Sequence, residues 1–265
     1  MRIQLFEFHD LPWYPHLWRH LLTTYSGFFA RTFDIFHPIV PRLAHALRQC
    51  NASTILDLCS GACGPLALLQ RQLAVEERYV VTVMLSDKYP DIDSFRDAAG
   101  ASDGALDFIG TPVDATAVPT TLRGFRTMFN AFHHFDPVTA RNILQDAATN
   151  RAGIGVFEYT ERSLVWYVSA VLSPLFFWFT GPLAIRPVSL VAFFWIYLVP
   201  VPVLLGTWDA LISCLRTYNL EALQTLTRSV EAADYVWESG RVRAFGGCYV
   251  TYLIGYPSPG RAGGA

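Results

Sequence analysis

Short apolar stretches alternate with longer amphipathic ones through the middle of the chain, between residues 54 and 160. The stretches of strand length are TILDL, YVVTVMLSD, LDFIG, FRTMFNAF and AGIGVFEY, and most of them are separated by segments with helical spacing. Strands that are apolar throughout are typical of a parallel sheet buried on both faces. With right-handed crossovers between the strands, this pattern predicts a doubly wound α/β sheet.

The two ends of the chain follow other patterns. Residues 1–50 are expected to be mainly helical after Pro15. The segment TWDALISCLRTYNLEALQTLTRS predicts one helix, or two helices broken near Asn219. The stretches DYVWESGRVR and GCYVTYLIGYP then predict a C-terminal antiparallel strand pair at the edge of the sheet. The expected fold is therefore a mostly parallel, seven-stranded α/β sheet.

Composition excludes several classes of protein. The net charge is −2 without a basic stripe, so a nucleic-acid partner is not expected. Five cysteines without a C-x-x-C pair indicate neither a disulfide framework nor a zinc knuckle, and no metal site is expected. The N-terminus lacks the continuous apolar core of a secretory signal. These features favour a cytoplasmic protein.

Polar residues follow every predicted strand of the parallel part. In open α/β sheets, ligands bind outside the carboxyl ends of the strands. Asp87 lies 23 residues beyond Gly64, a spacing that suits a carboxylate binding a ribose, although Asp is also a common helix cap. The residues at these ends are Asp57 with the loop 59–64, Ser86 with Asp87, Asp114, Asn130, and Glu158 with Tyr159.

A family resemblance rests on these segments. In order and spacing, ILDLCSGACG, LSDKYP, PVDAT and MFNAFHHF resemble the class I S-adenosylmethionine-dependent methyltransferases, over residues 40–160 and, through the last helix and strand pair, 208–256. The first motif of the family is an acidic residue followed by glycines at alternate positions. Here Asp57 and Gly61 keep the register, while Cys59 and Cys63 replace the outer glycines. The Cβ of Cys63 is expected to exclude a strained backbone.

The resemblance implies S-adenosyl-L-methionine as the cofactor. It places the loop against the methionyl part and the sugar, and Asp87 on the ribose hydroxyls. It places Asp114 and Ala115 at the adenine, and Asn130 and Ala131 along the cofactor. The cofactor-binding residues implied in this way are Asp57, Cys59, Ser60, Gly61, Gly64, Asp87, Lys88, Asp114, Ala115, Asn130 and Ala131.

The expected reaction is an in-line methyl transfer to an oxygen, nitrogen or sulfur atom, in which positioning supplies much of the acceleration. His133 and His134 follow the fourth predicted strand, near the expected methyl group, where a histidine can act as a base or can only cap a helix and fill a gap. Glu158 and Tyr159 are further candidates for orienting the acceptor. The expected acceptor is small and fairly hydrophobic or lipid-like, as in secondary metabolism. The alternative is a non-catalytic membrane-associated or scaffolding protein.

The N-terminal segment FEFHDLPWYP is a candidate lid over the substrate, or a segment that only docks a helix. Residues expected to contact substrate are Trp13, Tyr14 and Tyr25, with Glu7, His9 and Asp10 as further lid residues. Arg216 lies seven residues after Asp209, so both share one helical face. Arg216 could hold a carboxylate or phosphate of the substrate, or form a surface ion pair.

A hydrophobic insertion is predicted at residues 163–207. The runs 164–185 and 187–208 carry no charge, and each has about the length that spans a bilayer core. Three alternatives are open: a spanning hairpin, a monotopic hairpin with Arg186 near the headgroups, and an apolar cap over a hydrophobic substrate or a second copy of the chain. The remaining units are an N-terminal helical lid (1–50), a methyltransferase core (51–162 and 208–257) and a disordered tail (258–265).

Overall fold

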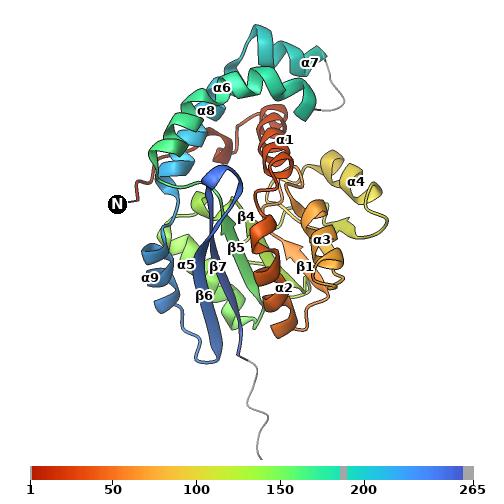
Figure 1. The fold of residues 1–265 in the computed structure, drawn as a ribbon, viewed down its shortest axis with the longest axis vertical. Coiled ribbons are helices and arrows are strands. Elements are labelled where there is room, and N and C mark those ends of the chain that lie inside the picture. Colours follow the sequence, from red (N-terminus) through yellow and green to blue (C-terminus); the bar gives the residue numbers. More distant parts are fainter. Residues whose placement is uncertain (1, 186–189, 259–265) are drawn as a thin grey trace, which may run out of the picture.

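The computed structural model describes residues 2–185 and 190–258 (Figure 1). The expectations for Arg186 and for residues 259–265 lie outside the described residues. One seven-stranded sheet has the order β3-β2-β1-β4-β5-β7-β6. The first five strands are parallel, and β7 is antiparallel to both of its neighbours, β5 and β6, as predicted. The strands are β1 (Thr54–Asp57), β2 (Thr82–Leu85), β3 (Leu106–Phe108), β4 (Phe125–Phe129), β5 (Ile154–Glu158), β6 (Tyr235–Arg243) and β7 (Tyr249–Pro257).

Helices occupy most of the remaining described chain. They are α1 (His16–Thr32), α2 (Val40–Gln49), α3 (Leu66–Val75), α4 (Ile92–Gly100), α5 (Pro137–Thr149), α6 (Leu164–Ala184), α7 (Leu190–Phe193), α8 (Val201–Arg216) and α9 (Leu220–Arg228). Short helical turns include η1 (Phe8–Asp10), η3 (Phe132–His134) and the π-helical η4 (Phe194–Leu198). The predicted strand FRTMFNAF is too long, because Asn130 turns the chain with φ +51° and η3 follows.

Side-chain alternation along the parallel strands builds one core on each face of the sheet. Ile55 and Phe157 lie in the core that includes residues of α2 and α3. Leu56 and Val156 lie in the core that includes residues of α5 and α9. Both faces are therefore buried, which explains why these strands are apolar without interruption.

A helical layer stands beyond the sheet (Figure 1). The helices α6, α7 and α8 form a hairpin, and α1 lies between this hairpin and the sheet. Leu21 of α1 joins Phe177 of α6 and Ile196 of η4 in a small third core. Helix α8 runs from residue 201 to 216 without a break, so the insertion and the core share a helix. We call residues 164–185 and 190–208 the cap hairpin.

Helix α8 is followed by a break and then by α9, as the two-helix alternative predicted. Asn219 is extended, and its side-chain oxygen accepts a hydrogen bond from the backbone N–H of Ala222 at 2.9 Å. This is an N-cap, which satisfies one of the free donors of the first helical turn. Asn219 therefore fixes the start of α9.

Replacing Asn219 by alanine is expected to lower the free energy of unfolding by about 1 kcal/mol, because the cap acceptor is lost. Asn219→Asp keeps an acceptor and should stay close to the wild type. Urea denaturation of the three proteins measures the difference. Equal stabilities for the Ala and Asp variants would show that the cap contributes nothing.

Candidate functional site

The loop between β1 and α3 has a left-handed backbone at four positions. Cys59, Gly61, Cys63 and Gly64 have φ values of +63°, +53°, +66° and +38°. The expectation that Cys63 excludes a strained backbone is therefore wrong, because both cysteines adopt a conformation that L-residues seldom adopt. The side chain of Cys63 is buried, and its thiol lies 3.4 Å from the carbonyl oxygen of Ser94.

Asp57 lies beneath this loop rather than on its surface. Its carboxylate accepts hydrogen bonds from the hydroxyls of Thr127, at 2.6 Å, and Ser60, at 2.7 Å. Only 1% of Asp57 is exposed, and this burial raises the pKa of its carboxyl to about 7. Asp57 and Ser60 thus brace the loop from within. Thr127 was not identified from the sequence, although it pairs with Asp57 in the register of β1 and β4.

Asp87 and Asp114 lie next to the loop, as predicted. The Asp87 carboxylate accepts hydrogen bonds from the backbone N–H groups of Gly61 and Tyr89, at 2.9 and 2.8 Å. Lys88 forms an ion pair with Asp114 at 3.1 Å, and this bond raises the pKa of the lysine. Ala115 is buried behind the pair.

Several acidic side chains act electrostatically on Cys59 of the loop. Burial and nearby carboxylates together raise the pKa of the Cys59 thiol well above its usual value. In decreasing order of effect, these carboxylates belong to Asp87, Asp57, Asp114 and Asp10. Asp10 comes from the N-terminal segment, so that segment reaches the same edge of the sheet.

Helix α1 crosses the loop. A Cβ at Gly61 would lie 3.4 Å from Thr23, and Arg31 donates a hydrogen bond to the carbonyl oxygen of Gly64 at 2.9 Å. His20 pairs with Asp91 at 2.6 Å, and this hydrogen bond raises the pKa of the histidine. These contacts place α1 against the loop between β1 and α3. No local sequence signal identified them.

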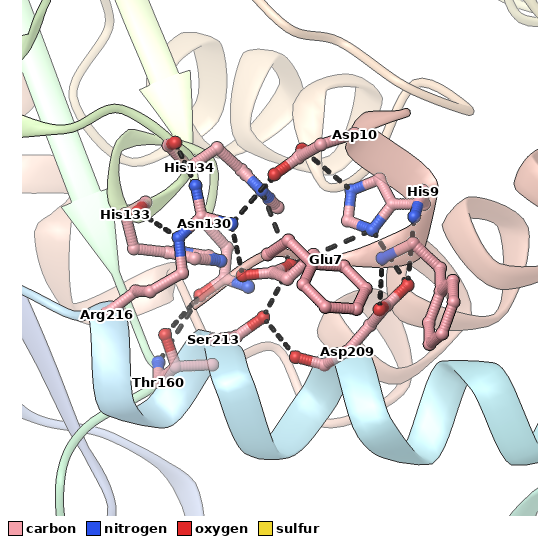
Figure 2. Close-up of polar contacts among 12 residues, drawn as sticks. Glu7, His9, Asp10, Asn130, His133, His134, Thr160, Asp209, Ser213 and Arg216 are labelled. Atoms are coloured by element: carbon pink, nitrogen blue, oxygen red, sulfur yellow. Dashed lines mark hydrogen bonds and ion pairs between the residues drawn. The ribbon is translucent and has the colours of Figure 1, made fainter. Parts of the chain in front are cut away.

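The ends of β4 and β5 are tied together (Figure 2). The side-chain oxygen of Asn130 accepts hydrogen bonds from the backbone N–H groups of Tyr159 and Thr160, each at 3.3 Å. Glu158 accepts from the backbone N–H of Phe132 at 2.7 Å and contacts Nδ1 of His133 at 2.6 Å. Burial acts to lower the pKa of His133, but the carboxylates of Glu158 and Glu7 together raise it.

Four residues of this region are buried. His133 is 1% exposed, and Glu158, Tyr159 and Ala131 are also buried. The Tyr159 hydroxyl lies 3.1 Å from that of Ser26. His133 and Glu158 are therefore placed to position the end of β4 rather than to meet an acceptor directly.

Arg216 is the centre of a buried ion-pair cluster (Figure 2). Its guanidinium contacts Glu7 at 3.1 Å and Asp10 at 2.7 Å, and it also donates to the carbonyl oxygens of His133 and His134. Arg216 is 3% exposed, so it is not a surface ion pair, and its donors already have partners. We call Glu7, Asp10 and Arg216 the clasp.

Asp209 holds the same N-terminal segment from α8. Its carboxylate accepts hydrogen bonds from the backbone N–H groups of Phe8, at 2.6 Å, and His9, at 3.2 Å. The helical face predicted for Asp209 and Arg216 thus contacts residues 7–10. The distant partners in that segment could not be assigned from the spacing.

His134 lies at the open side of the clasp. Its Nδ1 is 3.0 Å from Asp10 and 3.4 Å from Glu7, and its side chain is 19% exposed. Burial raises the pKa of Asp10, but His134 and Arg216 hold it far below its usual value. Of the two predicted histidines, His134 has the accessible surface.

Metal-ligating atoms also gather here. Glu7, His133 and His134, and likewise His9, Asp10 and His134, bring their ligand atoms within 4.8 Å of one another. The Arg216 guanidinium already supplies a positive charge to Glu7 and Asp10.

The predicted substrate contacts are not gathered in one place. Trp13 is 65% exposed, whereas Tyr14 is buried and its hydroxyl has no hydrogen-bond partner among the described residues. Tyr25 packs on Phe177 of the cap hairpin, with ring centroids 4.3 Å apart.

Comparison with known proteins gives likenesses of fold. No family model matches the chain, and no curated protein matches it in sequence. An O-methyltransferase family protein from Burkholderia thailandensis shares 17% identity over 85% of this chain, with a TM-score of 0.45. The magnesium protoporphyrin IX methyltransferase of Synechocystis, solved with bound SAH, shares 12% identity over 84% of this chain and 83% of its own, with a TM-score of 0.46.

A further similar structure comes from Rhodobacter sphaeroides and carries the name of a zinc-dependent alcohol dehydrogenase. It shares 15% identity with this chain, the alignment covers 90% of this chain and 98% of that protein, and the TM-score is 0.49. The chain spans 57% of the Burkholderia protein and 54% of a pyocyanin biosynthetic protein with 12% identity. These likenesses concern the course of the backbone.

The contribution of Asp57 to the free energy of unfolding is expected to fall as the pH rises from about 4 to 7. Its folded-state pKa of about 7 lies above the unfolded value of 3.8, so the folded protein binds more protons in this window. The free-energy difference between wild type and Asp57→Asn should change by up to about 4 kcal/mol across it. Urea denaturation at a series of pH values measures this change, with the exposed Asp103→Asn as control. Parallel curves for wild type and Asp57→Asn would contradict the raised pKa.

Arg216→Met is expected to lower the free energy of unfolding by about 3–5 kcal/mol, because Glu7 and Asp10 lose their buried counter-charge. Adding Glu7→Gln to this variant should recover part of the loss, since one uncompensated charge is removed. Thermal and urea unfolding provide the comparison. A wild-type stability for Arg216→Met would mean that the clasp does not hold the lid.

Proposed function

We propose that the protein is an S-adenosylmethionine-dependent methyltransferase. The observation that carries this proposal is the geometry at the loop between β1 and α3, where the Asp87 carboxylate accepts a hydrogen bond from the backbone N–H of Gly61 at 2.9 Å and Asp114 lies nearby in an ion pair with Lys88. S-adenosylmethionine carries a positive sulfonium and has no pyrophosphate, so carboxylates at this loop suit it. The same carboxylates oppose the pyrophosphate of a dinucleotide.

The residues at the loop suit the cofactor in distinct ways. Asp87 is partly exposed and has carboxylate oxygens for the ribose hydroxyls. Asp114 and Lys88 lie beside it, where Asp114 can accept from the adenine amino group. Asp57 and Ser60 support the loop from below. When bound, the cofactor supplies an electrophilic methyl group.

The acceptor end is assigned to the N-terminal segment and the end of β4. His134 has exposed surface and a carboxylate partner in Asp10, which suits it to accept a proton from an oxygen or nitrogen acceptor. The His133–Glu158 pair holds the neighbouring backbone, and the clasp holds Asp10. Catalysis in this proposal relies mainly on positioning, with proton transfer as an addition.

We infer that the acceptor is small and fairly hydrophobic or lipid-like. Aromatic residues of the lid and the cap hairpin support this inference, since Trp18 packs on Trp195 with ring centroids 4.9 Å apart. We place the protein in the cytoplasm, with its acceptors drawn from secondary metabolism or from lipid-like molecules.

Isothermal titration calorimetry with S-adenosylmethionine tests the proposal. The wild type is expected to bind, and Asp87→Ala should lose measurable binding because the ribose loses its acceptor. Asp93→Ala is the matched control, since Asp93 is an exposed acid of α4 that forms an ion pair with Arg96 at 3.0 Å.

Absence of binding to folded wild-type protein at high micromolar cofactor would overturn the proposal and favour a non-catalytic scaffolding role. Equal binding by wild type and Asp87→Ala would instead contradict the assignment of the ribose site.

A further inference from the structure

The cap hairpin exposes an unusually apolar surface. Helix α6 is long and apolar enough to cross a membrane, and only 22% of its most apolar part is buried. No charged residue occurs at 164–185 or 190–208. Large apolar side chains that are 47–89% exposed include those of Leu164, Val168, Leu175, Phe179, Leu190 and Leu198. A surface of this kind marks an interaction site.

One side of the hairpin is already covered by α1. Leu21 is buried against it, and Tyr25 packs on Phe177. Helix α1 also carries His16, Arg19 and His20. A hairpin surrounded by lipid would draw these polar side chains into the hydrocarbon, at high cost. The apolar surface is therefore one-sided, which suits insertion from one face of a bilayer.

The uncharged part of the return arm that follows its bend has the depth of a single leaflet. The pair Leu190–Leu198 and Val201–Arg216 meets the length and composition criteria for a span only when joined across a bend of 67°. After the bend, residues 201–208 are uncharged. The next residue, Asp209, is buried against the N-terminal segment. Eight helical residues rise roughly 12 Å, against roughly 15 Å for half of a bilayer core.

Basic residues stand at the foot of α6. Arg162 lies just before Ser163, the N-cap of α6, and Arg241 of β6 pairs with Glu161. Arg241 and Arg243 are both exposed. Cations at the boundary of an apolar surface complement the anionic headgroups of a cytoplasmic leaflet. A second copy of this chain would present the same arginines to each other, so the charge pattern favours lipid over self-association.

We propose that the cap hairpin inserts into one leaflet of an anionic membrane, with the arginines at its foot among the headgroups. The proposal does not depend on methyl transfer. If the proposed function also holds, the lid and the site beneath it lie at the membrane surface, where an apolar acceptor is concentrated.

Vesicle flotation of the full-length protein tests this proposal. Vesicles of phosphatidylcholine with about one third phosphatidylglycerol are compared with vesicles of phosphatidylcholine alone. The wild type should float with the anionic vesicles. Leu175→Ser with Phe179→Ser should reduce the bound fraction at least tenfold, because two exposed apolar anchors are lost.

The matched control is Val80→Ser with Val138→Ser, which alters two equally exposed apolar residues outside the cap hairpin and should bind like the wild type. Arg243→Gln should weaken binding to anionic vesicles about fivefold and leave binding to neutral vesicles unchanged. Circular dichroism confirms that each variant is folded.

Two results would overturn the proposal. One is a folded wild type that stays unbound with both vesicle types. If light scattering then shows a wild-type dimer, and the Leu175→Ser/Phe179→Ser variant is a monomer, the apolar surface would be assigned to a second copy of the chain. The other is equal loss of binding in the cap and control variants, which would mean that the cap hairpin is not the contact.

Discussion

The buried contact of Arg216 with Glu7 and Asp10 is the interaction on which the arrangement of the site depends. One guanidinium joins the N-terminal segment, the end of α8 and the backbone after β4. Unpaired, the buried charges of Glu7 and Arg216 would be costly, whereas Asp10 is partly exposed. The N-terminal segment, the end of α8 and the sheet edge are therefore held together.

This constraint gives the two histidines after β4 different environments. His133 is enclosed and paired with Glu158, so it fixes the turn that carries its neighbour. His134 keeps exposed surface and faces Asp10. The clasp also holds Asp10 where its carboxylate acts electrostatically on Cys59 of the loop.

The sequence predicted the parts of the molecule that depend on local pattern. Continuous apolar strands indicated the doubly wound sheet, and the break at Asn219 follows from its capping side chain. The spacing from the loop to Asp87 placed that residue correctly beside Gly61. The prediction for the loop backbone was wrong. Cys63 adopts a left-handed conformation that L-residues disfavour, so the surrounding structure must hold it there.

Pairings between distant segments could not be predicted. Glu7 and Arg216 lie 209 residues apart, so only the folded chain shows that they meet. The spacing of Asp209 and Arg216 placed both residues on one helical face, but it did not indicate that this face contacts residues 7–10. The hydrogen bond between Thr127 and Asp57 likewise depends on the register of β1 against β4. The residue pattern of one strand alone does not specify that register.

The central claim is that the carboxylate edge of the sheet binds a sulfonium cofactor beneath the lid. A crystal structure of the protein grown with S-adenosylmethionine tests it most directly. We expect the ribose hydroxyls on Asp87 and the methyl group on the side of His134. An adenosyl group bound away from Asp87, or no bound cofactor at saturating concentration, would contradict the account.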